Sequence, residues 1–255
     1  MSKLFSKRLF IYEIKTILLN WYIPFFGVIF PILLSQILGR TAFVSGVPEN
    51  MVPYIITEAY FNFILIIPLC VVMLGHASMY SQDLEHGIPQ RMKLFGISLR
   101  KQLCVRLVAI MLIDVASIIL FTLTYALSFR MLPATLSAIL TSLLVLTVVS
   151  VALFLIAHAI ALLFKKFEPT YGASMGLYFF FMITGGAMGI RPNQFPPFLK
   201  FIAQLFPFYH ASGDLGGLFY KSVNLAPMFQ SLIFFLFLSI VLLLLALHKN
   251  KKSFR

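Results

Sequence analysis

Charged side chains are scarce in this chain, and acidic ones especially so. Only 11% of the 255 residues are charged, and just eight are Asp or Glu, against 20 Lys and Arg. By contrast, 60% of the residues are hydrophobic and the mean hydropathy is +0.97. A soluble domain of this length needs far more polar side chains to cover its surface. The scarcity excludes a soluble globular protein and indicates a membrane protein.

Several chemical signatures are also missing. No Gly is followed by Lys, so the chain has no G-x-x-x-x-G-K-[ST] phosphate-binding loop and cannot hydrolyse ATP by that mechanism alone. It has no H-E-x-x-H motif, no short-period repeat and no low-complexity tract, so we expect one domain over residues 1–255 and no bound metal. Cys70 and Cys104 are far apart, and we interpret them as small hydrophobic residues rather than a disulfide or metal pair.

Long apolar runs are what the chain has instead. A hydrocarbon core of ~30 Å requires ~20 mostly apolar helical residues, and only a helix satisfies every backbone group within one such segment. Runs of this length predict an all-α membrane protein with six transmembrane helices. The predicted spans are residues 17–38, 58–80, 103–128, 136–164, 171–190 and 225–248.

The basic residues predict how these spans are oriented. Fifteen of the 20 Lys and Arg residues fall in the two terminal tails, between the second and third spans, and between the fourth and fifth; five fall on the other side. The positive-inside rule then places both termini in the cytoplasm. Anionic lipid headgroups suffice to explain the net charge of +12, so we expect membrane lipid and no nucleic acid as a partner. We expect the first span to be retained rather than cleaved as a signal peptide, and residues 3–19 before it to form a partly amphipathic helix on the inner membrane surface.

A basic segment, residues 83–101, separates the second and third spans. A helix starting near Pro89 is tolerated there because the first turn needs no amide donor, and Arg91 and Lys93 would point away from its apolar stripe. The predicted stripe comprises Ile88, Met92, Phe95 and Leu99. Such a helix either rests on the membrane among anionic headgroups or docks into a groove of another protein. The residues leave both interpretations open.

A second unusual segment, residues 191–221, links the fifth and sixth spans and is broken by prolines. Pro196 and Pro197 suit a helix start, whereas Pro207 disfavours helical continuation through Phe206. The piece between them is about 12 Å long and cannot cross a membrane. We therefore expect it to dip in from the outer face or to lie upon it, and to cap something there.

With these two segments in this order within six spans, the chain resembles the membrane subunit of type-2 ABC exporters, a family of six-span permeases. The first segment is similar to the family's cytoplasmic coupling segment, in which an acid is followed by Gly, then Arg, Leu and a terminal basic residue. Those places are filled by Glu85, Gly87, Arg91, Leu94 and Lys101. The second segment is similar to the family's outer segment, in which Pro-Pro opens a short helix and an aromatic-flanked Pro follows. Gly96 departs from the pattern, because many relatives carry Pro there.

The resemblance implies a permease of an ATP-driven exporter, in the plasma (inner) membrane of a bacterium. It implies two permease copies that alternate in access, together with two ATPase subunits that bind the ATP and Mg²⁺, while this chain binds no cofactor. The coupling helix would sit in a groove of the ATPase subunit, and the outer short helices would form an external gate. The gate residues are Pro196, Pro197, Phe198, Phe201, Pro207 and Phe208.

The apolar span surfaces favour a hydrophobic drug, a peptide or a lipid-like molecule as the substrate. Relatives of this size also export lipid-linked glycans, and no residue excludes them. Two further classes stay open. An intramembrane enzyme would need a convergent catalytic set, which the scattered histidines do not offer. A membrane anchor or sensor would recruit a soluble partner without ATP-linked transport.

Ionisable residues inside spans are expensive and are functional candidates by default. His76, Asp114 and His158 each lie about 10–12 Å from the cytoplasmic boundary, so we expect them to form one polar layer. The layer either fastens helices, with Asp114 paired to a histidine or to a serine such as Ser117, or lines a path for substrate or water.

Overall fold

The computed structural model describes residues 7–41, 46–188 and 194–250. Parts of four sequence predictions lie outside these ranges: residues 189–190 of the predicted fifth span, residues 191–193 of the outer segment, residues 3–6 of the N-terminal helix, and the C-terminal basic residues Lys251, Lys252 and Arg255. Every secondary-structure element of the described residues is a helix, and none is a strand. The expectation of an all-α protein is therefore confirmed for the part of the chain that the structure describes.

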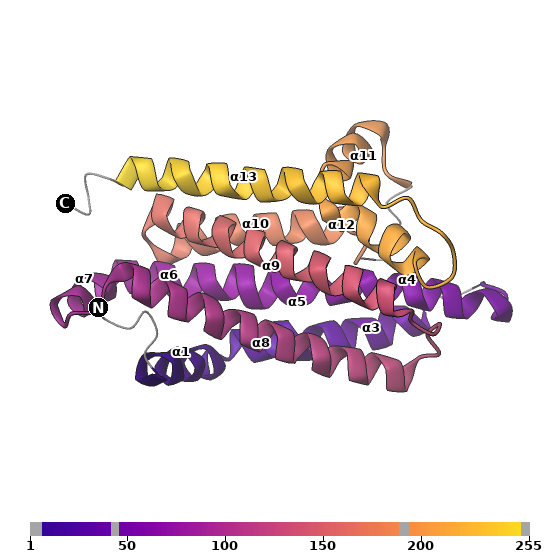
Figure 1. Ribbon diagram of the computed structural model, residues 1–255, viewed down its shortest axis with the longest axis horizontal. Coiled ribbons are helices and arrows are strands. Elements are labelled where there is room, and N and C mark those ends of the chain that lie inside the picture. The colour runs from indigo at the N-terminus through magenta and orange to yellow at the C-terminus, as the bar shows by residue number, and fades with distance from the viewer. Residues whose placement is uncertain (1–6, 42–45, 189–193, 251–255) are drawn as a thin grey trace.

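The elements follow one another as a bundle of long helices joined by short ones, with π- and 3₁₀-helices labelled η (Figure 1). In chain order they are α1 (Lys7–Leu19), α2 (Tyr22–Pro24), η1 (Phe25–Ile29), α3 (Phe30–Arg40), η2 (Glu49–Met51), α4 (Val52–Ile64), α5 (Ile66–Pro68), η3 (Leu69–Leu74), α6 (Gly75–Glu85), α7 (Ile88–Leu94), α8 (Leu99–Ser128), α9 (Leu136–Phe164), α10 (Phe167–Thr184), α11 (Pro197–Gln204), α12 (Pro207–His210), η5 (Ala211–Leu215) and α13 (Ala226–Asn250).

Among the described residues, five helical stretches are long and apolar enough to cross a membrane. They are Tyr22–Arg40, Glu49–Glu85, Leu99–Ser128, Leu136–Phe164 and Ala226–Asn250. Five of the six predicted spans are thus confirmed by length and composition. Their bounds shift most in the second span, which runs for 37 residues rather than from 58 to 80. Pro53 does not interrupt it, because this proline lies in the first turn of α4.

The remaining predicted span, 171–190, corresponds to α10. This helix has 18 residues, so it is about 27 Å long, and it carries Glu168 in its first turn. It packs against α6, η3 and α9 as one of the parallel rods of the bundle. Because its first half is rich in small and polar residues, it does not belong to the five strongly apolar stretches. A sixth crossing therefore stays a prediction.

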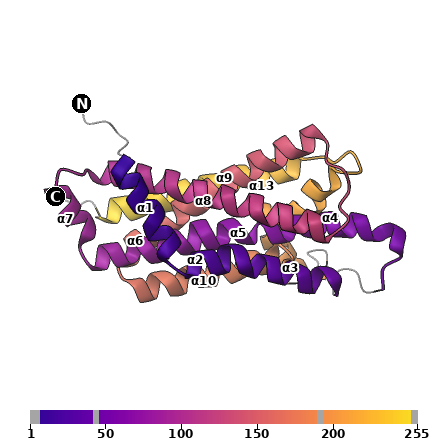
Figure 2. The ribbon, with the colours of Figure 1, turned by 90° about the horizontal axis from the view of Figure 1, so that it is seen from below.

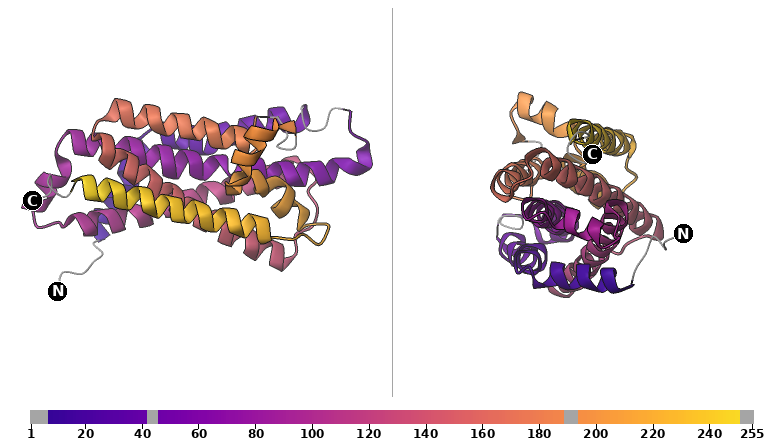
Figure 3. Two further views of the ribbon diagram at one scale, coloured as in Figure 1. Left: turned by 90° about the horizontal axis from the view of Figure 1, so that it is seen from above. Right: turned by 90° about the vertical axis from the view of Figure 1, so that its left-hand side faces the viewer.

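The N-terminal segment forms a helix of its own. A turn at Asn20 and Trp21 separates α1 from the first span, which therefore begins at Tyr22 rather than at residue 17. Figure 2 and the right-hand view of Figure 3 show α1 running across the bundle axis. It packs its buried Leu9, Glu13 and Ile17 on the bundle, chiefly against α8. The predicted separate helix is confirmed, and its rest on the membrane surface stays a prediction.

The stretch from α4 to α6 is the most buried of the five and forms the centre of the bundle (Figure 3). α9, α10, α8 and the first span pack around it. The first span approaches it closely because Gly27 has no side chain: a Cβ there would stand 2.3 Å from Cγ2 of Val71. α7 and the end of α13 lie at one end of the bundle, and η2 and α11 lie toward the other (Figure 1).

Candidate functional site

The basic segment forms a short helix, α7, that projects between two long ones. α6 ends at Glu85, and Gly87 turns the chain with a φ of 66°, so that Pro89 falls in the first turn of α7. After α7, Gly96 reverses the chain with a φ of 78°. Proline holds φ near −65°, so it cannot occupy this turn. The turn therefore explains why this chain has Gly96 at the position where many relatives of the family that it resembles carry proline.

The predicted apolar stripe through Leu99 is wrong. α7 ends at Leu94, and Leu99 begins α8, because the turn at Gly96 separates the two helices. The apolar surface lies instead at the tip, where Leu94 is 87% exposed and Phe95 is 84% exposed. Ile88 and Met92 are half-buried beneath them. We call the exposed pair Leu94 and Phe95 the coupling knob.

The other residues of the segment shape its base. The backbone N–H of Phe167 donates to Oε2 of Glu85 at 2.8 Å, which satisfies a free donor at the start of α10. The backbone N–H of Lys101 donates to the Ser98 hydroxyl that caps α8. Arg91 is exposed on α7. The predicted coupling residues thus divide into a tip, a turn and a base that joins α6 to α10.

The described part of the outer segment includes the short helices α11, α12 and η5. α11 begins at Pro197, and Phe206 is extended so that α12 can begin at Pro207, which confirms the predicted helix start and break. Phe198 and Phe201 are exposed on α11. The predicted gate residues thus separate into an exposed outer face and a deeper part.

The deeper part of the outer segment is anchored by Phe208. This ring is buried and stacks on Phe181 of α10, with ring centroids 4.6 Å apart. It also meets Phe235 of α13 edge to face at 5.7 Å. Aromatic pairs of this kind add stability beyond the area that they bury.

The outer segment also contacts the second span, which the sequence pattern did not predict. The Tyr220 hydroxyl donates to Oε1 of Glu58, and Gly216 packs so closely that a Cβ would stand 2.8 Å from Cα of Glu58. Burial and this hydrogen bond raise the pKa of Tyr220, so the phenol stays the donor. In the sequence, Glu58 marked only the start of a predicted span. An acid in so apolar a run was the signal that could have indicated a polar contact at this position.

The predicted single polar layer is also wrong, because its members form two separate pairs. The ring nitrogens Nε2 of His76 and Nδ1 of His158 lie 3.2 Å apart, and His76 stacks on Phe154. The Ser150 hydroxyl donates to Oδ2 of Asp114 at 2.7 Å. Since Ser150 precedes His158 by eight residues on α9, the two pairs differ in depth by about 12 Å.

Ser117 is not the partner of Asp114. Its hydroxyl donates to the backbone carbonyl of Ile113 one turn earlier in the same helix. Each polar pair instead joins two different helices, α6 with α9 and α8 with α9. Interhelical hydrogen bonds of this kind are a usual way to fasten helices in a membrane.

A buried ion triad was missed altogether. Nε of Arg106 in α8 lies 2.8 Å from Oε2 of Glu13 in α1, and Nη2 of Arg106 lies 2.6 Å from Oδ2 of Asp83 in α6. The side chains are 2%, 0% and 17% exposed, respectively. Arg106 was predicted to be a loop charge. The available signal for the triad was Glu13, the lone acid among the basic residues of α1. We call these three residues the Arg106 triad.

The described residues form a bundle of apolar helices long enough to cross a membrane, with α7 projecting at one end and the short helices α11 and α12 toward the other. In sequence, residues 41–248 match the family described as ABC-2 family transporter protein. This match covers most of the chain, so the chain belongs to the ABC-2 transporter family. It is the membrane permease component of an ABC transporter, the component that associates with an ABC ATPase subunit. No curated protein matches the chain in sequence.

Proposed function

We propose that the chain is the permease of an ATP-driven exporter in a bacterial plasma membrane. Two copies of it would work with two ATPase subunits that bind ATP and Mg²⁺, and both termini would face the cytoplasm. The substrate would be a hydrophobic drug, a peptide or a lipid-like molecule. Family membership supports the transport role, and the basic flanks of the spans support the orientation.

The coupling knob is the observation that carries this proposal. An exposed apolar pair at the tip of a basic helix is costly in water and suits a groove of a partner protein. The base of the same helix is tied through Glu85 to α10 and continues directly into α6 and α8. A movement of the ATPase groove would therefore reach three long helices at once.

Transport would then follow from two arrangements of the permease pair. ATP binding would bring the ATPase subunits together and favour one arrangement, and hydrolysis would restore the other. The short outer helices would act as the external gate, in which Phe208 serves as an anchor and the exposed Phe198 and Phe201 form the surface that meets the released substrate.

The first test is association with the ATPase subunit. We would co-express the chain with the ATPase encoded beside it, purify through a tag on the permease, and measure co-purification and ATP hydrolysis. Leu94→Asp with Phe95→Asp removes the apolar tip of the knob, and we expect it to abolish co-purification, because a groove that accepts two apolar side chains rejects two carboxylates.

Gln90→Asp is the matched control. It adds an acid to an exposed position of the same helix without removing apolar surface, so the ATPase should still co-purify. Retention of the ATPase by the double variant would contradict docking through the knob. It would return α7 to a helix that rests on the membrane surface.

A further inference from the structure

An open cavity of about 490 Å³ lies near the base of α7. Its walls come from the end of α1, the turn before α2, the last turns of α6 and the start of α10. Among the described residues that line it, Asp83 is the only ionisable acid and none is Lys, Arg or His. The chain as a whole has a net charge of +12 and only eight acids, so a cavity lined by an acid and by no basic residue differs from the average charge of the protein.

Four aromatic rings line this cavity in an unbroken series of contacts. Trp21 stacks on Tyr22 with ring centroids 4.3 Å apart, Tyr22 lies 6.4 Å from Tyr171 across the cavity, and Tyr171 stacks on Phe167 at 5.4 Å. Aromatic faces attract cations through their quadrupole, and clusters of them are a usual means of binding quaternary ammonium groups.

The acid in the wall carries charge that the protein does not fully balance. Arg106 is the one cation of its triad, whereas Glu13 and Asp83 are two anions, so the triad has a formal charge of −1. Glu13 and Arg106 are buried, and Asp83 alone of the three lines the cavity. Asp83, whose Oδ2 also meets Arg106, is therefore the acid of the triad that an occupant of the cavity can reach.

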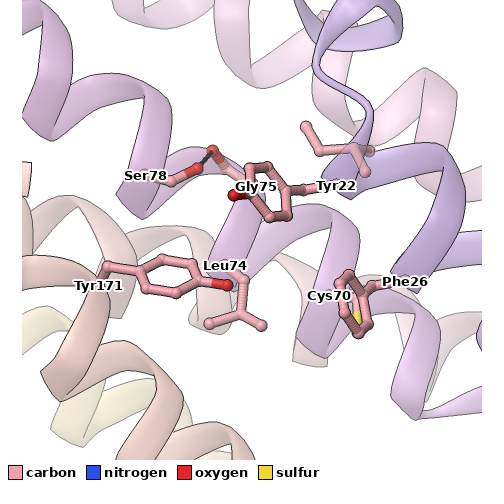
Figure 4. Close-up of a pocket in the computed structure, with 8 residues that line it drawn as sticks. Tyr22, Phe26, Cys70, Leu74, Gly75, Ser78 and Tyr171 are labelled. Atoms are coloured by element: carbon pink, nitrogen blue, oxygen red, sulfur yellow. Dashed lines mark hydrogen bonds between the residues drawn. The ribbon is translucent and has the colours of Figure 1, made fainter.

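A smaller cavity of only about 20 Å³ adjoins the main one on the side of the middle of the bundle. Tyr22, Ser78 and Tyr171 line both, and in Figure 4 the two tyrosines approach from opposite helices over Leu74 and Gly75. The remaining lining of the smaller cavity is almost entirely apolar, made of Ile23, Phe26, Cys70, Leu74 and Gly75. Polarity thus falls from an acidic mouth, through aromatic walls, to an apolar floor.

A second hollow of about 420 Å³ adjoins the mouth and shares Gln82 and Phe167 with it. It carries Glu85 and Glu168 against Lys166, together with His86. This adjoining hollow is therefore lined by two carboxylates and one lysine, so it also carries more acid than fixed base.

We propose that the main cavity binds amphipathic organic cations, in which a quaternary or protonated centre is attached to apolar groups. Such a molecule places its charge beside Asp83 and against the lining aromatic rings, and its apolar groups toward Tyr22 and Tyr171. These cations are the substrate class of the transporter, and this last step rests on the proposed export function. A cavity of about 490 Å³ is in the usual size range for a drug-sized ligand.

The chain contains its own reporter for this binding. Trp21 is its only tryptophan and lines the cavity, so its fluorescence reports on an occupant directly. We would titrate the purified full-length chain in lipid nanodiscs with tetraphenylphosphonium and, separately, with tetraphenylborate. The two ions have the same shape and opposite charge. We expect saturable quenching by the phosphonium and at least about tenfold weaker binding of the borate, since only the cation gains from the rings and the acid.

Two variants test the walls independently. Asp83→Asn removes the excess charge and Tyr171→Leu removes one ring, and we expect each to weaken phosphonium binding about tenfold. Glu49→Gln is the matched control, because it removes an equal charge from an exposed acid toward the other end of the bundle. If Asp83→Asn does not yield folded protein, Tyr171→Leu carries the test. Equal responses to both ions, or unchanged binding in the folded variants, would overturn the proposal.

Export is measured separately, in proteoliposomes that contain the permease and its ATPase. ATP-driven movement of tetraphenylphosphonium that Tyr171→Leu reduces would support both proposals. Selective binding without ATP-driven movement of any solute would overturn the export proposal and leave the binding site standing. ATP-driven movement of another solute, in a chain that does not bind the phosphonium, would overturn the cation site and leave export standing.

Discussion

At the scale of the residue, a few charges hold much of the α7 end of the bundle together. Arg106 reaches from α8 to Glu13 on α1 and to Asp83 on α6, so one guanidinium joins three helices. Burying charges is costly unless they are paired, and removing one partner leaves the others without compensation. The stability of this end should therefore depend on Arg106 far more than on exposed cations nearby.

We expect Arg106→Met to lower the free energy of unfolding by about 3–5 kcal/mol, because it leaves two carboxylates without their cation. The measurement is denaturant unfolding in mixed micelles, followed by the fluorescence of Trp21. Arg100→Met is the control: Arg100 is exposed on the same helix, and its loss should change stability by less than about 0.5 kcal/mol. Adding Glu13→Gln and Asp83→Asn to Arg106→Met should restore most of the loss. Equal effects of the two single Arg variants would contradict a structural triad.

Pairing of this kind could not be predicted from the sequence. Glu13 and Arg106 are 93 residues apart, and their contact depends on how α1 crosses α8. The same holds for Asp114, whose partner Ser150 is set by the register between α8 and α9 rather than by its nearest serine. Depth along a helix can be counted from the sequence, but the rotation and offset of neighbouring helices cannot.

At the scale of the element, the sequence alone predicted where a helix starts or ends wherever a proline or glycine restricts the backbone conformation. Pro197 and Pro207 start short helices where their positions predict, and the fourth span has its predicted bounds, 136–164. The prediction of a single apolar stripe through Leu99 is wrong because the chain turns at Gly96. Hydropathy also could not give the true length of the second span, since its last part, α6, is polar yet continues as helix.

The outer segment is held at two places, inside by Phe208 and at its edge by Tyr220. Tyr220→Phe removes the donor to Glu58, and we expect amide hydrogen exchange in residues 211–220 to become about tenfold faster, because a buried hydrogen bond is worth about 1 kcal/mol or more. The measurement is exchange followed by mass spectrometry. Tyr209→Phe is the control, since Tyr209 lies in the same segment and its ring contacts His210. Unchanged exchange after Tyr220→Phe would show that Phe208 suffices as an anchor.

At the scale of the whole molecule, the two ends of the bundle have opposite characters. The end with α7 carries the coupling knob, the Arg106 triad and the acidic cavity. α11 and α12 lie toward the other end and carry the proposed gate (Figure 1). The proposed function requires the first end to face the ATPase in the cytoplasm, so orientation is the property on which every other assignment depends.

Single cysteines test that orientation. Lys93→Cys on α7 and Phe198→Cys on α11 each replace an exposed residue, and the Cys104→Ser chain that keeps only the buried Cys70 is both the parent and the blank. A membrane-impermeant maleimide added to intact cells should label Phe198→Cys but not Lys93→Cys, because the proposed orientation, with the basic flanks in the cytoplasm, places α7 on the inner side. After the membrane is permeabilised, both should react and the blank should not. Labelling of Lys93→Cys in intact cells would reverse the orientation. It would place the coupling knob where no ATPase subunit can reach it.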